Sequence, residues 1–258
     1  MFNVFIYNIS SIYEFRKDTF LKLHFIHGFL GKPEDWNIFR SFFKEYEIEF
    51  HSIYKYFSQL NQKNHFEEWA HIFNQNSCLA KTNQKNIVIG YSLGGRLALH
   101  SLFSQNSNWD AAVIISANPG LIYDHEKQLR IESDKLWANR FLNENLSNVI
   151  EDWNAQPIFM GQKNPNLHDT NNLNRTEIYN TLINFSLSKQ KNFRKNLYEI
   201  KIPLLWLSGL KDTKFSNITK EISLLNPKIN TYIFNDAAHR VPWDCPNEFA
   251  KKCIEFLF

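Results

Sequence analysis

Glycine is scarce in this 258-residue chain, which contains only 8 glycines, about 3% of the residues, against a usual share of about 7%. A chain with so few glycines is expected to place them where the backbone needs a positive φ angle or a close approach of two segments. The glycine positions therefore indicate turns of special geometry.

Other features are also scarce, and each absence excludes a class of protein. The three cysteines, Cys78, Cys245 and Cys253, form neither a C-x-x-C pair nor an even set, which argues against structural zinc and favours a reducing, cytoplasmic location. The net charge is only +3 and no long Lys/Arg run occurs, so no nucleic-acid partner is predicted. Because the apolar runs are no longer than strands, no membrane span is predicted.

Aromatic residues make up 16% of the chain and charged residues 21%, a composition typical of a folded globular protein. The length fits one domain or one domain that carries an insertion. Residues 1–13 are apolar and aromatic but lack a basic segment, so we expect a leading β-strand there rather than a signal peptide.

Short apolar segments rich in β-branched residues alternate with longer segments of helical periodicity. This alternation predicts an α/β fold with a mostly parallel sheet flanked by helices. The expected strands are 21–26, 87–89, 111–115, 204–207 and 231–234, and the expected helices are 35–45, 65–75, 93–104, 217–225 and 246–257.

The alternation stops between residues 120 and 200. This stretch has no convincing strand, but it has helix-like segments at 124–141, 143–152 and 175–187. We therefore expect a helical cap, residues 120–200, inserted into a core made of residues 1–119 and 201–258.

The strongest local motif is the segment IVIGYSLGGR, residues 87–96. It reads as a strand, then G-x-S-x-G, then a helix, which is the arrangement of a nucleophile elbow. Small residues two positions before and after Ser92 let the strand and helix backbones pass closely. The motif predicts a catalytic role for Ser92; the alternative is a serine that only caps the helix.

A serine needs a positioned imidazole, itself oriented by a carboxylate, to act as a nucleophile or base. In folds built on this elbow the chain order is Ser, then Asp or Glu, then His. Asp212 and His239 follow two successive predicted strands, so both are expected at the sheet edge where active sites of open α/β sheets lie. Asp236 is a competing acid on the same loop as His239.

An oxyanion hole needs two backbone N–H groups aimed at the charge that develops. In this kind of fold one comes from the residue after the nucleophile, here Leu93. The other is expected from the segment HGFLG, residues 27–31, where Phe29 is the natural donor. The alternative for this segment is an ordinary helix turn.

Several segments together resemble one branch of the α/β-hydrolase superfamily, the MenH family of 2-succinyl-6-hydroxy-2,4-cyclohexadiene-1-carboxylate synthases. They are FIHGFLGKPEDW, VIGYSLGGRLALH, SANPGL, KLWANRF, EDWNAQPIF, FSLSKQ and GLKDTKF. The matches extend from about residue 21 to 240 and include the expected cap.

The resemblance implies a carbon–oxygen lyase of menaquinone biosynthesis that eliminates pyruvate from 2-succinyl-5-enolpyruvyl-6-hydroxy-3-cyclohexene-1-carboxylate, without a cofactor or a metal. Ser92 would be the base, activated by His239 and Asp212. The residues that match the family's pocket positions are Tyr91, Arg96, Arg130 and Trp153. Guanidinium groups suit a small polycarboxylate substrate, and Lys214 and Arg240 are candidates to add positive charge.

The chain departs from the family pattern in three places. Downstream of His239 the family often has a second histidine, where this chain has Arg-Val-Pro. The family's second cap arginine falls near Thr170, with Arg175 as a possible substitute. The loop that usually reads D-x-P-G-H-G is replaced by EFHSIYKYFSQ, without glycine or proline.

Two other functions use the same fold. One is a serine carboxylesterase or thioesterase, such as a pimeloyl-carrier-protein methyl ester esterase, for which the cap would meet an acyl carrier protein. The other is a non-catalytic binding protein, which would require a broken triad. Arginines that point into the pocket favour the lyase, whereas a long apolar channel favours the esterase.

Overall fold

The computed structural model describes residues 20–61, 64–77, 84–160 and 173–257. Within these residues, six strands form one sheet in the order β2-β1-β3-β4-β5-β6, and every neighbouring pair is parallel. The strands are β1 (Phe20–Ile26), β2 (Glu47–His51), β3 (Gln84–Tyr91), β4 (Ala111–Ile115), β5 (Leu204–Gly209) and β6 (Asn230–Phe234). The predicted α/β class is confirmed.

Two apolar layers cover the two faces of this sheet. On strand β3, Ile87 and Ile89 face one layer and Val88 faces the other, because successive side chains of a strand point to opposite faces. The Val88 layer includes residues of α1 (His65–Ser77), α2 (Leu93–Leu102), α6 (Arg194–Tyr198) and α7 (Thr213–Leu225). The other layer includes residues of the 3-10 helix η1 (Pro33–Phe39), α8 (Val241–Asp244) and α9 (Pro246–Leu257).

One expected helix was wrong, and one strand was not predicted. The segment expected as a helix over 35–45 is instead the short η1, which begins at Pro33 and ends at Phe39. Strand β2 was not among the expected strands, although its sequence EIEFH alternates apolar and polar residues. The expected strand in residues 1–13 lies outside the described residues. None of the described helices is both long enough and apolar enough to span a membrane.

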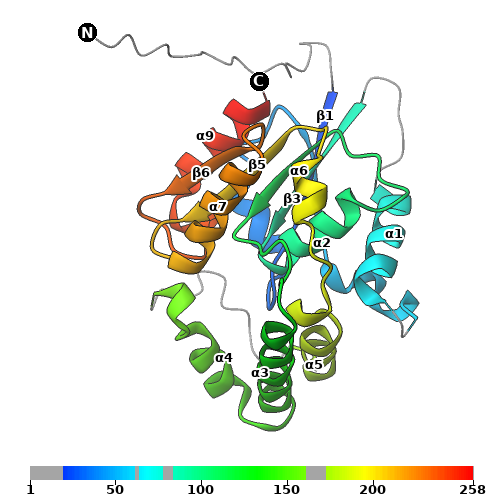
Figure 1. The fold of residues 1–258 in the computed structure, drawn as a ribbon, viewed down its shortest axis with the longest axis vertical. Coiled ribbons are helices and arrows are strands. Elements are labelled where there is room, and N and C mark those ends of the chain that lie inside the picture. The colour runs from blue at the N-terminus through cyan, green and yellow to red at the C-terminus, as the bar shows by residue number, and fades with distance from the viewer. Residues whose placement is uncertain (1–19, 62–63, 78–83, 161–172, 258) are drawn as a thin grey trace.

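Three helices between β4 and β5 form a separate layer, grouped at one end of the sheet in Figure 1. They are α3 (Asp124–Asn143), α4 (Leu146–Asn154) and α5 (Arg175–Asn184). Their apolar side chains, including Phe141, Val149 and Leu182, form a cluster of their own that also includes Leu30 from the core.

The two ends of this helical segment lie side by side. The backbone N–H of Phe193 donates to the carbonyl of Pro119 at 2.7 Å, and Phe193 and Leu197 already pack in the layer beneath the sheet. Such adjacent ends are what an insertion into a folded core requires. The bounds 120–200 stay a proposal for the cap, whose last residues pack against the core.

Because β1 lies in the centre of the packed core, replacing a leucine of this strand should destabilise the protein far more than replacing an exposed leucine. Leu23 is completely buried in β1 whereas Leu224 is 83% exposed on α7. We expect Leu23→Ala to lower the free energy of unfolding by about 2 to 5 kcal/mol, and the control Leu224→Ala to change it by less than about 0.5 kcal/mol. Urea unfolding curves measure both, and equal midpoints would contradict this assignment of the core.

Candidate active site

The segment after β3 turns sharply and presents Ser92 at the sheet edge. Ser92 has φ 53° and ψ −111°, a backbone conformation that is uncommon for a residue with a side chain. The turn is compact because a Cβ atom on Gly90 would lie 2.4 Å from the Gly94 carbonyl oxygen. A Cβ atom on Gly94 would lie 2.4 Å from the carbonyl oxygens of Ile26 and His27. The glycines therefore let β3, α2 and the end of β1 meet at the serine.

Asp212 follows β5 and is the N-cap residue of α7. One carboxylate oxygen, Oδ1, accepts the Phe215 backbone N–H at 3.2 Å, which fixes the side chain at the positive end of the helix. The other oxygen, Oδ2, lies 2.7 Å from Nδ1 of His239. Asp212 is buried, so its carboxylate is held in one orientation.

His239 lies in the loop after β6, between Asp212 and Ser92. Its Nδ1–H donates to the carboxylate, which leaves Nε2 as an acceptor 3.0 Å from the Ser92 Oγ. The rings of Tyr91, Phe159 and Phe215 surround the imidazole. The structure thus brings the three predicted residues together in the order that a serine triad needs.

The competing acid Asp236 lies elsewhere. Its side chain is 90% exposed, and its carboxylate is 4.0 Å from the Lys211 Nζ. Because the imidazole Nδ1 already bonds to Asp212, the geometry favours Asp212 for the acid position.

The segment expected to form the oxyanion hole lies beside the serine. Phe29 and Leu93 both line the cavity that contains Ser92. His27 lies 2.8 Å from the Gly28 carbonyl through Nδ1 and 3.2 Å from the Ile53 N–H through Nε2. Nδ1 must therefore carry the proton, and the His27 ring links this loop to the backbone of Ile53.

The cavity has a volume of about 220 Å³ and lies between the sheet edge and the cap helices. All of the residues expected to bind substrate line it, namely Tyr91, Arg96, Arg130 and Trp153. Trp153 packs on Phe29 with ring centroids 4.8 Å apart, so a cap side chain covers the predicted oxyanion loop. Burial raises the pKa of Tyr91, which keeps its hydroxyl neutral.

Two arginines of the cavity are held in different ways. Arg96 donates from Nη1 to the Phe185 carbonyl at 3.0 Å. Burial lowers the pKa of Arg96, and the charge of Arg130 lowers it further. Arg130 donates from Nε to both carboxylate oxygens of Asp134, at 2.9 and 2.8 Å. Asp134 is buried, so it fixes Arg130 in place.

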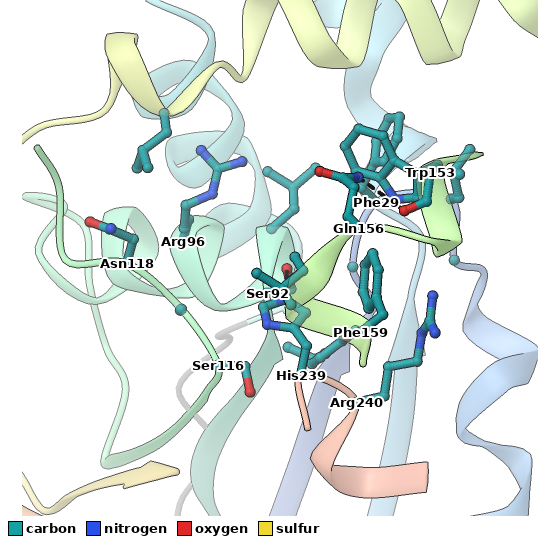
Figure 2. Close-up of a pocket in the computed structure, with 18 of the residues that line it drawn as sticks. Phe29, Ser92, Arg96, Ser116, Asn118, Trp153, Gln156, Phe159, His239 and Arg240 are labelled. Carbon is teal, nitrogen blue, oxygen red and sulfur yellow. Dashed lines mark hydrogen bonds between the residues drawn. The ribbon is translucent and has the colours of Figure 1, made fainter. Parts of the chain in front are cut away.

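Lys214 and Arg240 line the same cavity, as Figure 2 shows for Arg240, which lies on the opposite side of Ser92 and His239 from Arg96. Arg240 stacks on Phe159 with its guanidinium carbon 3.9 Å from the ring centroid, and it donates to the Asn154 side chain in the cap. Burial lowers the pKa of both cations. Arg240 is buried in the cavity wall, whereas Lys214 lines the cavity from an exposed position at its rim.

The proposed substitute for the family's second cap arginine does not reach the cavity. Arg175 donates to the backbone carbonyls of Phe141, Leu142 and Glu144 at the end of α3, and it is not among the residues that line the cavity. It is therefore a capping residue of the helix. Thr170 lies outside the described residues.

Sequence reasoning missed several polar residues of the cavity wall. They include Asp134, Ser116, Asn118 and Gln156. Asp134 had a detectable signal, since it lies four residues after Arg130 on the expected helix. No sequence pattern indicated Ser116. This residue has φ 46°, and its buried Oγ lacks a hydrogen-bond partner among the described residues.

The fold and this arrangement define an enzyme of the α/β-hydrolase class. Residues 61–225 match the family model described as serine aminopeptidase, S33. A Haemophilus influenzae protein with the provisional name 2-succinyl-6-hydroxy-2,4-cyclohexadiene-1-carboxylate synthase is 31% identical over 213 residues, 78% of this chain and 85% of that protein. The synthase of Klebsiella pneumoniae is 26% identical over 232 residues, 87% and 88% of the two chains.

The solved structure of MenH from S. aureus covers 95% of this chain and 96% of its own, with a TM-score of 0.81 and 22% identity. A thermophilic esterase from Thermogutta terrifontis covers 93% and 90%, with a TM-score of 0.66 and 14% identity. These two structures share the fold. By the family model and the sequence relatives, the chain belongs to the α/β-hydrolase family and, within it, to the 2-succinyl-6-hydroxy-2,4-cyclohexadiene-1-carboxylate synthases.

The elbow geometry predicts that two glycines differ in their tolerance of alanine. A Cβ atom on Gly94 meets only backbone atoms, at 2.4 Å, whereas one on Gly28 meets the Tyr91 ring at 2.9 Å, and a ring can shift. We expect Gly94→Ala to destabilise the protein by about 1 to 3 kcal/mol or more and Gly28→Ala to cost less. Urea unfolding of both variants tests this, and a milder effect at Gly94 would contradict the close packing of the elbow.

Proposed function

We propose that the chain eliminates pyruvate from 2-succinyl-5-enolpyruvyl-6-hydroxy-3-cyclohexene-1-carboxylate and so forms 2-succinyl-6-hydroxy-2,4-cyclohexadiene-1-carboxylate in menaquinone biosynthesis. The observation that carries the proposal is the aligned set of Ser92, His239 and Asp212 in a cavity lined by four cationic side chains. The relatives with this name support it. We expect the reaction to take place in the cytoplasm.

In the proposed reaction, Ser92 and His239 act together as the base. The imidazole Nε2 accepts the serine proton while the serine oxygen removes a proton from a ring carbon of the substrate. The electron pair left on carbon forms a new C=C bond, and the C–O bond to the enolpyruvyl group breaks. The leaving enolate takes the proton back from the imidazolium and becomes pyruvate, so no water is consumed.

Two features of the site would stabilise the charge that develops in this reaction. The carboxylate of Asp212 stabilises the imidazolium of His239 at 2.7 Å. The backbone N–H groups of Phe29 and Leu93, at the cavity wall beside the serine, are the proposed donors to the substrate oxygen that becomes negative.

The charges of the cavity wall suit a small polycarboxylate. The cations are Arg96, Arg130, Lys214 and Arg240, whereas the carboxylates that line the cavity are Asp35 and Asp134. Because Asp134 bonds to Arg130, it positions one cation without occupying the others. Each substrate carboxylate could then bind a cation through charge-assisted hydrogen bonds.

Replacing the serine tests the proposed base. We expect Ser92→Ala to lower kcat for pyruvate release by at least about 10³-fold, because the imidazole loses the hydroxyl that it activates. The fold should persist, since one oxygen is removed from a turn at the cavity surface. Ser223→Ala, on α7 outside the cavity, is the matched control. A near-native rate for Ser92→Ala would rule out the serine-base mechanism.

Replacing one cavity arginine tests the proposed substrate class. We expect Arg96→Ala to lower kcat/KM for the polycarboxylate by about 10- to 100-fold, the worth of a charge-assisted hydrogen bond. The control is Arg140→Ala, which removes an arginine of α3 that bonds to Glu144 and Asp152 outside the cavity. Equal values of kcat/KM for the two variants would reject the role of Arg96.

A further inference from the structure

Two histidines and a glutamate from neighbouring strands lie together on one face of the sheet, away from the catalytic cavity. His24 belongs to β1, and Glu49 and His51 belong to β2. In the parallel register His24 pairs with Glu49. Residues two apart in a strand share a face, so His51 lies on the same face as Glu49. None of the three lines the cavity around Ser92.

The potential ligand atoms of the three side chains are close to one another. His24 Nδ1 is 2.9 Å from His51 Nε2 and 3.9 Å from Glu49 Oε2, and one ligand atom from each residue fits within 4.8 Å of the other two. Both histidines are buried, whereas the Glu49 side chain is 39% exposed. The cluster therefore has a protected interior and an opening to solvent at Glu49.

The hydrogen bonds fix the proton positions of the two rings. His24 Nε2 lies 3.2 Å from Asn86 Oδ1, and a carbonyl oxygen only accepts, so the proton is on Nε2. His24 Nδ1 is then a lone pair that accepts the His51 Nε2–H. A metal-binding histidine usually has its second ring nitrogen bonded in this way. The amide of Asn86 thus occupies the position of an outer-sphere partner.

The surroundings favour neutral imidazoles, the form that binds metals. Both rings are buried and in direct contact, and neither burial nor this contact favours a positively charged imidazole. The rings of Trp109 and Phe73 pack on the two imidazoles and exclude water from their inner side.

We propose that His24, His51 and Glu49 form a zinc-binding site. Two imidazole nitrogens and one carboxylate are a known ligand set of Zn²⁺. Ligand atoms about 2.0 to 2.1 Å from a tetrahedral ion lie roughly 3.3 Å apart. The two imidazole nitrogens, now 2.9 Å apart, must therefore separate slightly, and the Glu49 carboxylate, now 3.9 Å from His24 Nδ1, must move closer. A water molecule from the solvent side would be the fourth ligand.

Binding requires no net loss of a proton. The His51 proton moves from Nε2 to Nδ1, which faces Glu49 Oε1 at 3.7 Å, and the freed Nε2 lone pair binds the metal. Lys22 now contacts both Glu49, at 2.8 Å, and Glu47, at 3.1 Å. It therefore keeps Glu47 as a partner when Glu49 turns toward the ion.

The bound ion would stabilise the chain at the end of β2. Ile53, two residues after His51, donates its N–H to His27, and His27 is part of the predicted oxyanion loop. The sequence predicts no metal site because no motif joins these residues, which parallel strand pairing brings together across a separation of 27 positions.

Zinc titration of the full chain after chelator treatment tests the site. We expect one Zn²⁺ per chain by calorimetry, no binding of Mg²⁺, and a melting temperature raised by roughly 5 to 10 °C at a hundredfold excess over Kd. His51→Gln should weaken zinc binding by at least a hundredfold, and Glu49→Gln by about tenfold or more. The control His71→Gln removes an exposed histidine of α1 and should bind like the wild type.

Ring ¹⁵N spectra of the wild type provide a second measurement that needs no variant. Zinc should shift the signals of His24 Nδ1 and His51 Nε2 and move the His51 proton to Nδ1. Failure of the wild type to bind zinc, or zinc shifts confined to other histidines, would overturn the proposal, as would a His51→Gln variant that binds as tightly as the wild type. None of these outcomes depends on the reaction proposed for Ser92.

Discussion

The close passage of three backbone segments at the elbow is the constraint on which the site depends. Gly94 approaches the carbonyls at the end of β1 so closely that no side chain fits between them. This contact places Ser92 beside the predicted oxyanion loop and turns its hydroxyl toward the imidazole of His239. At the other edge of the site, Gly209 leaves no room for a Cβ atom next to the carbonyls of Ala237 and Ala238. The ends of β5 and β6 are thereby held together, and the acid and the imidazole meet.

Burial strengthens the interactions that the charged groups of this site can make with a substrate. In the proposed reaction Ser92, His239 and Asp212 supply the base, while the helices between β4 and β5 cover the other side of the cavity with aromatic rings and cations. Trp153 on α4 packs against Phe29, and Arg130 on α3 is fixed by the buried Asp134. In a partly desolvated cavity such fixed charges interact more strongly with a substrate than they would in water. An elimination that creates a carbanion and releases a carboxylate product suits these surroundings.

The elbow, the strand ends and the helices between β4 and β5 could be predicted because each has a local pattern. G-x-S-x-G between a strand and a helix specifies the position of Ser92, and the order of the strands places Asp212 and His239. Side-chain partners across the fold have no such pattern. Arg175 was a candidate for the second cap arginine but caps α3, whereas Arg240, a candidate for added positive charge, stacks on Phe159 in the cavity. The pair His24 and His51 arises only when β2, which was not expected, joins the sheet.

The reaction proposed for Ser92, His239 and Asp212 is an elimination rather than an ester hydrolysis. The most direct test compares kcat/KM of the wild-type enzyme for pyruvate release from the cyclohexene carboxylate with its kcat/KM for hydrolysis of a pimeloyl-carrier-protein methyl ester. The cationic cavity predicts that pyruvate release is favoured by at least about 10²-fold, corresponding to about 2.7 kcal/mol of differential transition-state binding. Rapid ester hydrolysis without measurable pyruvate release would contradict the account.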